Sequence, residues 1–132
     1  MFSDQPFTHE DKEFIYYMAG NEEVFNYKEL IKDHKLQVKS DSDGEVILRL
    51  YLKYGIEKCL QLITGEYAFY IIKINKKTQE ANVILARDHC GIRPMFYFYN
   101  KEELGFSSLM KGLISYMNTD KVKPLNLALI HI

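Results

Sequence analysis

The chain has 132 residues, of which 47% are hydrophobic and 14% aromatic, which favours one packed domain over a disordered segment. Its 17 basic and 18 acidic residues leave a net charge of -1, so we expect neither nucleic acid nor an anionic membrane as a partner. No stretch approaches the roughly 20 apolar residues of a membrane span, and the first residues lack the apolar core of a signal peptide. Cys59 and Cys90 lack the spacing of a zinc motif or a disulfide framework. These features predict a soluble protein of the reducing cytoplasm.

The first predicted elements are a strand and a helix. Residues 14–19 form a short aromatic and β-branched run before Gly20, which is typical of a buried strand. Asn21 would then lie just beyond that strand. Asn26 can cap a helix over 27–34, because its side chain can accept hydrogen bonds from the free N–H groups of the first turn.

Two more helices are predicted before the middle of the chain. The stronger one covers 45–54, with Ser42 or Asp43 as its cap and Gly55 placed to end it in a left-handed turn. Apolar residues then recur at helical spacing and predict a short helix with Cys59 on its inner face. Cys59 is therefore expected to be a core thiol.

The second half is predicted to consist mostly of strands, over 67–74 and 81–86 as a hairpin with a polar loop, then over 95–99 and 104–107. A last helix is predicted from Ser108 to Tyr116. Residues 118–132 show no clear periodicity, and Pro124 argues against a helix there. Strands that neighbour one another in antiparallel fashion, together with helices, indicate an α+β fold with layered sheets, doubly wound α/β being the weaker alternative.

Four segments carry a family resemblance, in the order GNEEVFNY (20–27), SDGEVIL (42–48), GEYAF (65–69) and ARDHCGIRP (86–94). Together they resemble a class II (type 2) glutamine amidotransferase domain, and most nearly the glutaminase domain of glutamine-hydrolysing asparagine synthetase. Further matches at Gln5-Pro6, Phe106-Ser107-Ser108 and 121–124 extend the likeness over most of the chain. It implies a layered α/β/β/α sandwich of the N-terminal-nucleophile hydrolase type, incomplete at the amino terminus. Residues 1–117 would form the partial domain and 118–132 a linker-like tail.

The resemblance also assigns roles to the first segment. Asn21 would donate to the oxyanion that forms when the amide is attacked, and Glu23 would hold the α-ammonium group of glutamine. Glu22 stands where the family has glycine, so its backbone N–H could still serve the oxyanion, but its Cβ would be strained if the position needs a positive φ. The residues alone instead favour an ordinary turn asparagine at position 21.

Asp43 has two interpretations. A carboxylate at a helix start commonly caps the helix, and the residues alone favour that role. The resemblance instead implies that Asp43 contacts the substrate amine, where it would form an anionic pair with Glu23 around one cation.

A charged cluster in the last segment invites a catalytic interpretation, but we expect it to be structural: Arg87, Asp88, His89 and Arg93. In the family the equivalent segment shapes a turn between strands, and its charges pair with one another and with the backbone. Paired charges at turns are also commoner than catalysis. No sequence motif for a cofactor or a metal occurs, so none is implied.

The family's nucleophile is a cysteine at its own amino terminus, whereas this sequence starts Met1-Phe2-Ser3-Asp4. Cys90 is a poor substitute, because its neighbour His89 would point to the opposite face of a strand. Leu109 also stands where the family has glutamate. The resemblance thus implies a glutaminase domain that would supply ammonia for asparagine synthesis but is inactive alone. The alternative is a non-catalytic binding or structural protein on the same scaffold. Glutamine remains a possible ligand, and an open sheet edge predicts self-association or a partner chain.

Overall fold

The computed structural model describes residues 5–99, 104–107 and 127–131. The helices and strands of these ranges, in chain order, are β1 (Phe7–Glu10), β2 (Phe14–Val24), α1 (Tyr27–His34), α2 (Asp43–Tyr54), α3 (Ile56–Leu62), β3 (Gly65–Asn75), β4 (Ala81–Arg87), β5 (Phe96–Tyr99), β6 (Leu104–Ser107) and β7 (Leu127–His131). None of the helices described is long and apolar enough to cross a membrane.

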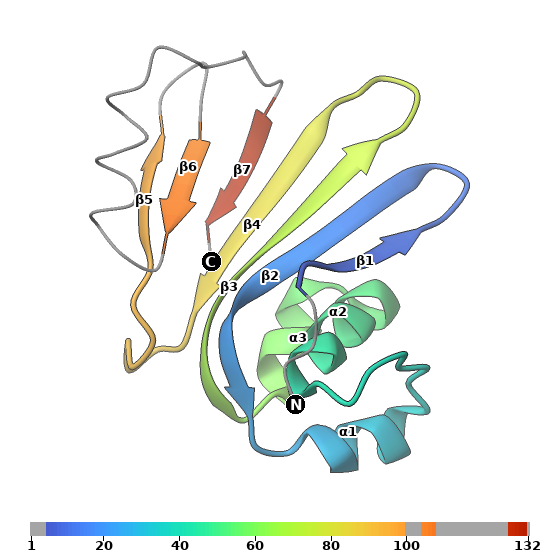
Figure 1. The fold of residues 1–132 in the computed structure, drawn as a ribbon, viewed down its shortest axis with the longest axis vertical. Coiled ribbons are helices and arrows are strands. Elements are labelled where there is room, and N and C mark those ends of the chain that lie inside the picture. The colour runs from blue at the N-terminus through green and yellow to red at the C-terminus, as the bar shows by residue number, and fades with distance from the viewer. Residues whose placement is uncertain (1–4, 100–103, 108–126, 132) are drawn as a thin grey trace.

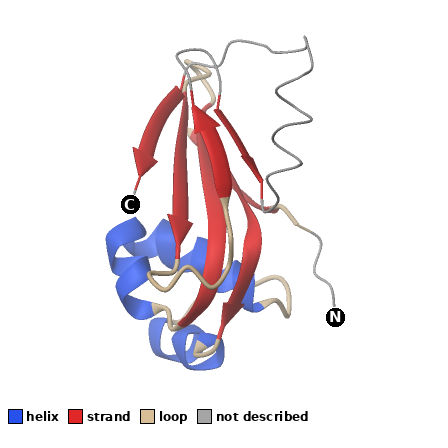
Figure 2. Ribbon diagram, turned by 90° about the vertical axis from the view of Figure 1, so that its left-hand side faces the viewer, coloured by secondary structure: helices blue, strands red, loops and turns tan. Residues whose placement is uncertain are grey.

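The strands form two sheets. The larger has five strands in the order β1-β2-β3-β4-β7, and the smaller is the pair β5-β6. All neighbours are antiparallel except β4 and β7, which run parallel. The three helices lie together on one side of the larger sheet (Figure 1), and the side view shows them over the end where β2 stops and β3 starts (Figure 2).

The core lies between the helices and one face of the larger sheet. Successive side chains of a strand point to opposite faces, so Met18 of β2 and its neighbours Phe69 and Ile71 of β3 can all face the helices. All three are at most 1% exposed. On the opposite face, the rings of Tyr70 in β3 and Phe106 in β6 lie 4.2 Å apart between centroids. The small sheet therefore packs against the face turned away from the helices.

The caps of the helices agree only partly with the sequence. Ser42 caps α2 by accepting a hydrogen bond from the N–H of Gly44 at 3.3 Å. Asn26 precedes α1, but its side chain makes no cap bond. It instead donates to the carbonyl oxygen of Leu62 and accepts from the N–H of Thr64, both at 2.9 Å. The capping role predicted for Asn26 is wrong, because its side chain ties the start of α1 to the connection between α3 and β3.

Three strand assignments differ from the sequence analysis. Strand β2 continues through Gly20 to Val24, so Asn21 lies inside a strand rather than beyond its end. Strand β1 was not predicted. Leu127–His131 fall in the stretch predicted to be linker-like, but they form β7 and pair with β4. The helix predicted over 108–116 and the domain boundary at 117 lie outside the described residues.

Gly20 occupies a point where β2 and β3 approach closely. A Cβ added there would lie 2.4 Å from the carbonyl oxygen of Ala68 and 2.6 Å from the Cα of Phe69. We expect Gly20→Ala to lower the free energy of unfolding by about 2 kcal/mol, since backbone atoms of β3 must move. Glu80→Ala is the comparison, because Glu80 is exposed in the loop between β3 and β4 and the change adds no atom near another strand. That variant should lose less than about 0.5 kcal/mol. Urea denaturation measures both, and equal losses would contradict the close approach.

Candidate functional site

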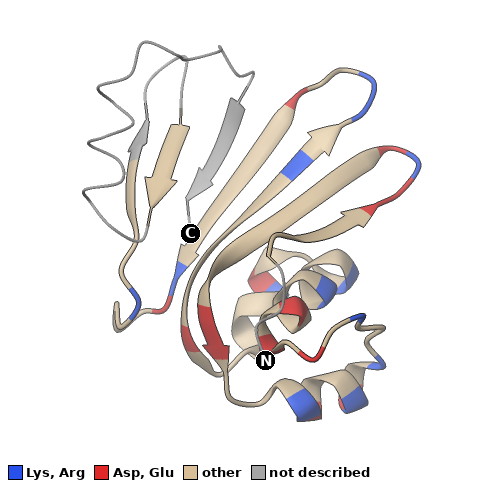
Figure 3. Cartoon of the chain, in the orientation of Figure 1, with Lys and Arg blue, Asp and Glu red and all other residues tan. Residues whose placement is uncertain are grey.

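The residues that the resemblance singles out lie at the end of β2, but on two faces of the sheet. Strand alternation puts Glu22 on the same face as Met18 and Val24, both buried beneath the helices. Asn21 and Glu23 share the opposite face, on which the small sheet packs. Figure 3 shows acidic residues concentrated at this end of β2 and β3. The candidate residues therefore lie on both faces of β2, with Glu22 on the helix side and Asn21 and Glu23 on the side of the small sheet.

Asn21 lines a pocket between the two sheets. The pocket has a volume of about 320 Å³, which is at the lower end of the range for small-molecule sites. It is lined by Gly20, Asn21, Ala68, Tyr70, Pro94, Met95, Phe106 and Ser107. Among the residues that the structure describes, none hydrogen-bonds the Asn21 side chain, so its amide N–H groups are available to a bound carbonyl oxygen.

Glu23 is paired with Arg93, which lies 70 positions later in the chain. Its Oε2 lies 3.3 Å from Nη2 of Arg93, and Nε of Arg93 lies 3.4 Å from Oε2 of Glu66. Glu23 and Glu66 are direct register partners on β2 and β3, so Arg93 bridges two neighbouring carboxylates. The Glu23 side chain is 58% exposed, and exposed ion pairs of this kind are weak. A ligand ammonium group could therefore share or displace the guanidinium.

Asp43 holds the end of β2 to the start of α2. Its Oδ2 accepts a hydrogen bond of 2.6 Å from the backbone N–H of Val24. Ser42, and not Asp43, is the cap of α2. No contact joins Asp43 to Glu23 in the part of the chain described, where Glu23 pairs with Arg93. The carboxylate on which Asp43 acts electrostatically is Glu22.

Glu22 is a largely buried carboxyl group. Its Oε1 accepts a hydrogen bond of 2.8 Å from Nε2 of Gln5, while its Oε2 is buried without a hydrogen-bond partner among the described residues. Burial, followed by the nearby Asp43 carboxylate, raises the pKa of Glu22 from 4.5 to about 7, against smaller lowering effects of Gln5 and Arg93. A Cβ on Gly44 would lie 2.1 Å from Glu22 Oε1, so the glycine makes room for this side chain.

Glutamate fits this position without backbone strain. The described non-glycine residues with positive φ are Lys35 and Gln79, and Glu22 is not one of them. The strain considered for a glutamate at a family glycine therefore does not arise. Glu22 sits within the β2–β3 ladder opposite Tyr67, and the oxyanion role of its N–H stays a prediction.

In the charged segment after β4, Asp88 bonds to the backbone and organises the turn, as predicted, whereas Arg93 pairs outside the segment with Glu23 and Glu66. The Asp88 side chain accepts hydrogen bonds from the N–H groups of Tyr67 at 3.2 Å, Ile92 at 3.0 Å and Arg93 at 3.4 Å. Asp88 is 5% exposed, whereas His89 is exposed. The turn that Asp88 holds is what carries Arg93 to Glu23.

Neither cysteine lines the Asn21 pocket. Cys59 is fully buried, its thiol lies 3.5 Å from the carbonyl oxygen of Ile47, and burial raises its pKa to about 12. The predicted core thiol is confirmed. Cys90 is exposed in the segment after β4 and is not among the residues that line the Asn21 pocket. A reactive thiol needs a stabilised thiolate beside a base, and Cys59 lacks both.

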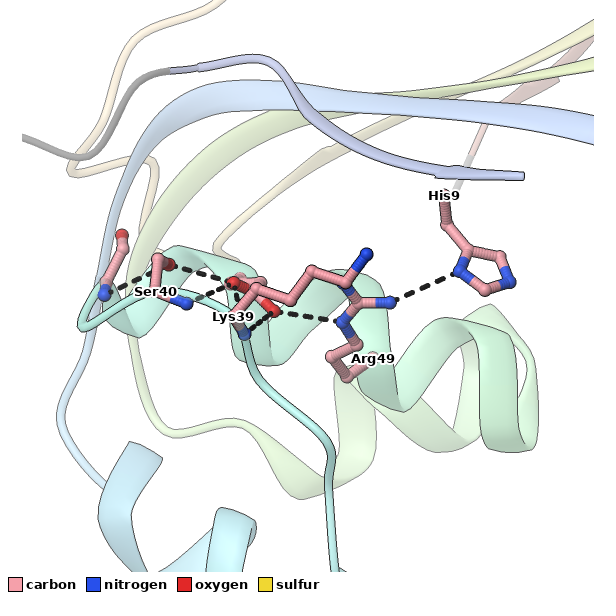
Figure 4. Close-up of polar contacts among 6 residues, drawn as sticks. His9, Lys39, Ser40 and Arg49 are labelled. Atoms are coloured by element: carbon pink, nitrogen blue, oxygen red, sulfur yellow. Dashed lines mark hydrogen bonds and ion pairs between the residues drawn. The ribbon is translucent and has the colours of Figure 1, made fainter.

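A buried polar network that was not predicted from the sequence is centred on Glu45, which is 3% exposed. Its carboxylate accepts from the N–H groups of Lys39 and Ser40, from the hydroxyl of Ser40, and from Nε of Arg49. Arg49 also reaches Nδ1 of His9 at 3.3 Å, and because a guanidinium only donates, that nitrogen must accept (Figure 4). Ser42 and Glu45 have the S-x-x-E spacing of a capping box, but Glu45 bonds the N–H groups of Lys39 and Ser40 rather than that of Ser42, so no local motif indicated this network.

The comparisons with known proteins extend over nearly the whole chain. The profile of the glutamine amidotransferase domain family matches residues 2–130. The asparagine synthetase (glutamine-hydrolysing) of Gallus gallus is 35% identical over 115 residues, which cover 86% of this chain and 20% of that protein. Asparagine synthetase (glutamine-hydrolysing) 2 of Bacillus subtilis is 40% identical over 113 residues, covering 85% and 14%. The chain thus spans a fifth or less of these relatives.

A solved structure shows the same fold. Glutamine phosphoribosylpyrophosphate amidotransferase from B. subtilis, complexed with ADP and GMP, superposes with a TM-score of 0.60 at 23% identity. The match covers 79% of this chain and 24% of that one. It confirms the predicted fold class, an α+β arrangement of layered sheets and helices of the N-terminal-nucleophile hydrolase type.

Proposed function

Because this chain belongs to the glutamine amidotransferase domain family and is related to the glutaminase domain of asparagine synthetase, we propose that it binds glutamine in the pocket lined by Asn21. The full reaction proposed is hydrolysis of glutamine to supply ammonia for asparagine synthesis. We further propose that the 132 residues bind glutamine without hydrolysing it on their own.

The position of Asn21 carries this proposal. Asn21 lines a pocket of a size suited to an amino acid, on the opposite side of β2 from the helices. The carboxamide carbonyl of glutamine would lie against the Asn21 side chain, where N–H donors stabilise the negative charge that develops on attack. The other residues that line the pocket are mainly apolar, while Asn21 itself is exposed to solvent and can be reached by a ligand.

Glu23 is the proposed ligand for the α-ammonium group. It lies two residues from Asn21 on the same strand, so both side chains project to the same face. Arg93, which binds Glu23 at 3.3 Å, already demonstrates that a cationic group fits beside this carboxylate. Asp43, whose oxygen is bonded to Val24, is better suited to holding the strand end than to contacting the amine.

The surroundings of the two thiols support the proposal that these residues do not hydrolyse glutamine on their own. Attack on an amide by cysteine requires a thiolate and a base within hydrogen-bond reach. The pKa of Cys59 is about 12 and its sulfur is buried in the core, whereas Cys90 does not line the pocket. A catalytic thiol, and the synthetase domain that would consume ammonia, would have to be contributed by other residues of a longer polypeptide or by another chain.

Calorimetric titration of glutamine into the purified chain, with ammonia assayed in the same sample, tests the proposal. We expect binding with no ammonia release. Glu23→Gln should weaken binding about tenfold, which corresponds to about 1.4 kcal/mol for a lost charge-assisted contact. Glu66→Gln is the matched control, because it removes the other partner of Arg93 and should leave the affinity within about twofold.

Other outcomes would decide against parts of the proposal. If glutamine did not bind, the alternative of a non-catalytic structural protein on the same scaffold would be favoured. If ammonia were released and neither Cys59→Ser nor Cys90→Ser abolished it, a different nucleophile would be required. Equal weakening by Glu23→Gln and Glu66→Gln would assign the effect to Arg93 rather than to the amine.

A further inference from the structure

Arg93 lies beside one end of the Asn21 pocket. The two residues that follow it in the chain line that pocket, whereas its own side chain contacts the carboxylates of Glu23 and Glu66. In the register of β2 and β3, Glu23 and its partner Glu66 come two residues beyond Asn21 and its partner Ala68. Residues two apart in a strand share a face of the sheet. The pocket is therefore followed, along the same face, by an ion cluster of Glu23, Glu66 and Arg93.

The cluster has one positive charge too few. Glu23 and Glu66 are carboxylates that lie directly opposite each other on neighbouring strands, and like charges in that position destabilise a sheet. Arg93 is the one cation that the described part of the chain brings into contact with them. A further cation beside Glu23, such as the ammonium group of a ligand, would complete the neutralisation.

The guanidinium group of Arg93 has donors to spare. It carries several N–H groups in a planar fork, but its hydrogen bond with the described residues is a single one, from Nη2 to Glu23 at 3.3 Å. Nε lies 3.4 Å from Oε2 of Glu66, and it is buried without a hydrogen-bond partner in the same part of the chain. Because a guanidinium suits a pair of parallel hydrogen bonds to a carboxylate, Arg93 can bind a further carboxylate and stay beside Glu66.

The backbone of Arg93 is held independently of its side chain. The Asp88 carboxylate accepts hydrogen bonds from the N–H groups of Ile92 at 3.0 Å and Arg93 at 3.4 Å. The side chains of Arg93 and Glu23 are 29% and 58% exposed, and ion pairs as open as this one are weak. The guanidinium can therefore exchange one partner for another while the turn after β4 stays in place.

We propose that Arg93 is a specificity-determining residue that binds the α-carboxylate of the ligand. This rests on the proposed binding of the α-ammonium group by Glu23. In an α-amino acid both groups are attached to the same carbon, so an ammonium that replaces Nη2 of Arg93 at Glu23 brings its carboxylate against the guanidinium. Each ion of the original pair then keeps an opposite charge beside it. The site thereby selects free α-amino acids, whereas an amine without a carboxylate meets Arg93 as a like charge.

Calorimetric titrations of the whole chain with glutamine and with glutaminamide test the proposal. Glutaminamide keeps the ammonium group and the side-chain carboxamide, but a neutral amide replaces its α-carboxylate. The wild type should bind glutamine at least about tenfold more tightly than glutaminamide. In Arg93→Gln, the affinity for glutamine should fall by about tenfold, while that for glutaminamide should rise because the repelling cation is gone. Arg87→Gln, which changes the exposed arginine at the end of β4, should keep the wild-type preference.

Opposite changes for the two compounds separate recognition from damage to the fold, which would weaken both. Equal wild-type affinities for glutamine and glutaminamide would overturn the role of Arg93 and leave the proposed function standing. A loss of both affinities in Arg93→Gln would also overturn it, because Arg93 would then act only on the structure.

If Arg93→Gln did not fold, the Nε–H signal of Arg93 in NMR spectra of the wild type would decide. That signal should shift when glutamine is added and much less with glutaminamide, and equal shifts would contradict the proposal. Binding of neither compound would contradict the proposed function together with the role of Arg93.

Discussion

Replacing Glu45 by alanine is expected to lower the free energy of unfolding by about 4 kcal/mol, in the range for breaking a buried charged network. The carboxylate is 3% exposed and satisfies the N–H groups of Lys39 and Ser40 together with Nε of Arg49. Its removal leaves those donors without an acceptor in a site that water reaches poorly. The loop before α2 would lose its attachment, and with it the placement of Asp43.

Urea denaturation followed by circular dichroism measures this loss. Glu57→Ala is the control, since Glu57 is an exposed residue in the first turn of α3 and should lose less than about 0.5 kcal/mol. Glu45→Gln keeps the shape of the side chain but presents an NH₂ group to donors, so it should also destabilise strongly. If Glu45→Gln matched the wild type, the charge of Glu45 would have no part in the network.

The pH dependence of the same network has a definite sign. Burial by itself raises the pKa of Glu45, but the Lys39 N–H and the Arg49 and Ser40 side chains outweigh it and leave the pKa lowered from 4.5. A carboxyl group with a lowered folded pKa contributes stability that is present above its unfolded pKa and lost as the pH falls through the folded value. The difference between wild type and Glu45→Gln should therefore shrink in acid.

Much of the fold was predictable because its elements have strong local patterns. The helix over 45–54 and the hairpin of 67–74 and 81–86 have periodic apolar residues, and all three appear within about two residues of the predicted bounds. The strands that were not predicted correctly depend on pairing with residues distant in the sequence. Strand β7 is defined by pairing with β4, and β2 crosses Gly20 because β3 pairs with it as far as Val24. A local pattern treats that glycine as a stop.

In the candidate site too, the residues could be singled out from the sequence, whereas the contacts between distant residues could not. Family resemblance was enough to single out Asn21, Glu22, Glu23 and Asp43, but not to say which of them meet. The turn assumed after Gly20 concealed the alternation that puts Glu22 and Glu23 on opposite faces. The pairing of Glu23 with Arg93 joins residues 70 positions apart, and no local signal in the sequence indicates it.

Glu22→Gln is expected to make the protein more stable at pH 8 by up to about 3 kcal/mol, and to change its stability little at pH 4. The folded pKa of Glu22 is raised from 4.5 to about 7, so the native state binds this proton more tightly than the unfolded chain. Wild-type stability should therefore fall as the pH rises between these values, and the loss is complete above pH 7. At about 1.4 kcal/mol per pKa unit, the rise in the pKa of Glu22 on folding corresponds to about 3 kcal/mol.

Urea midpoints measured from pH 4 to pH 8 test this expectation. Glutamine at position 22 cannot ionise, so the variant should lack the fall in stability between 4.5 and about 7 that the wild type shows. Glu80→Gln, an exposed change in the loop between β3 and β4, should keep it. A fall of the same size in Glu22→Gln would assign the pH dependence to another group. If the fall is absent in Glu22→Gln but present in the wild type, the chain tolerates a buried ionisable group beside Asn21 at a cost in stability. Such a cost is expected where a strand end is adapted to a ligand rather than to maximal stability.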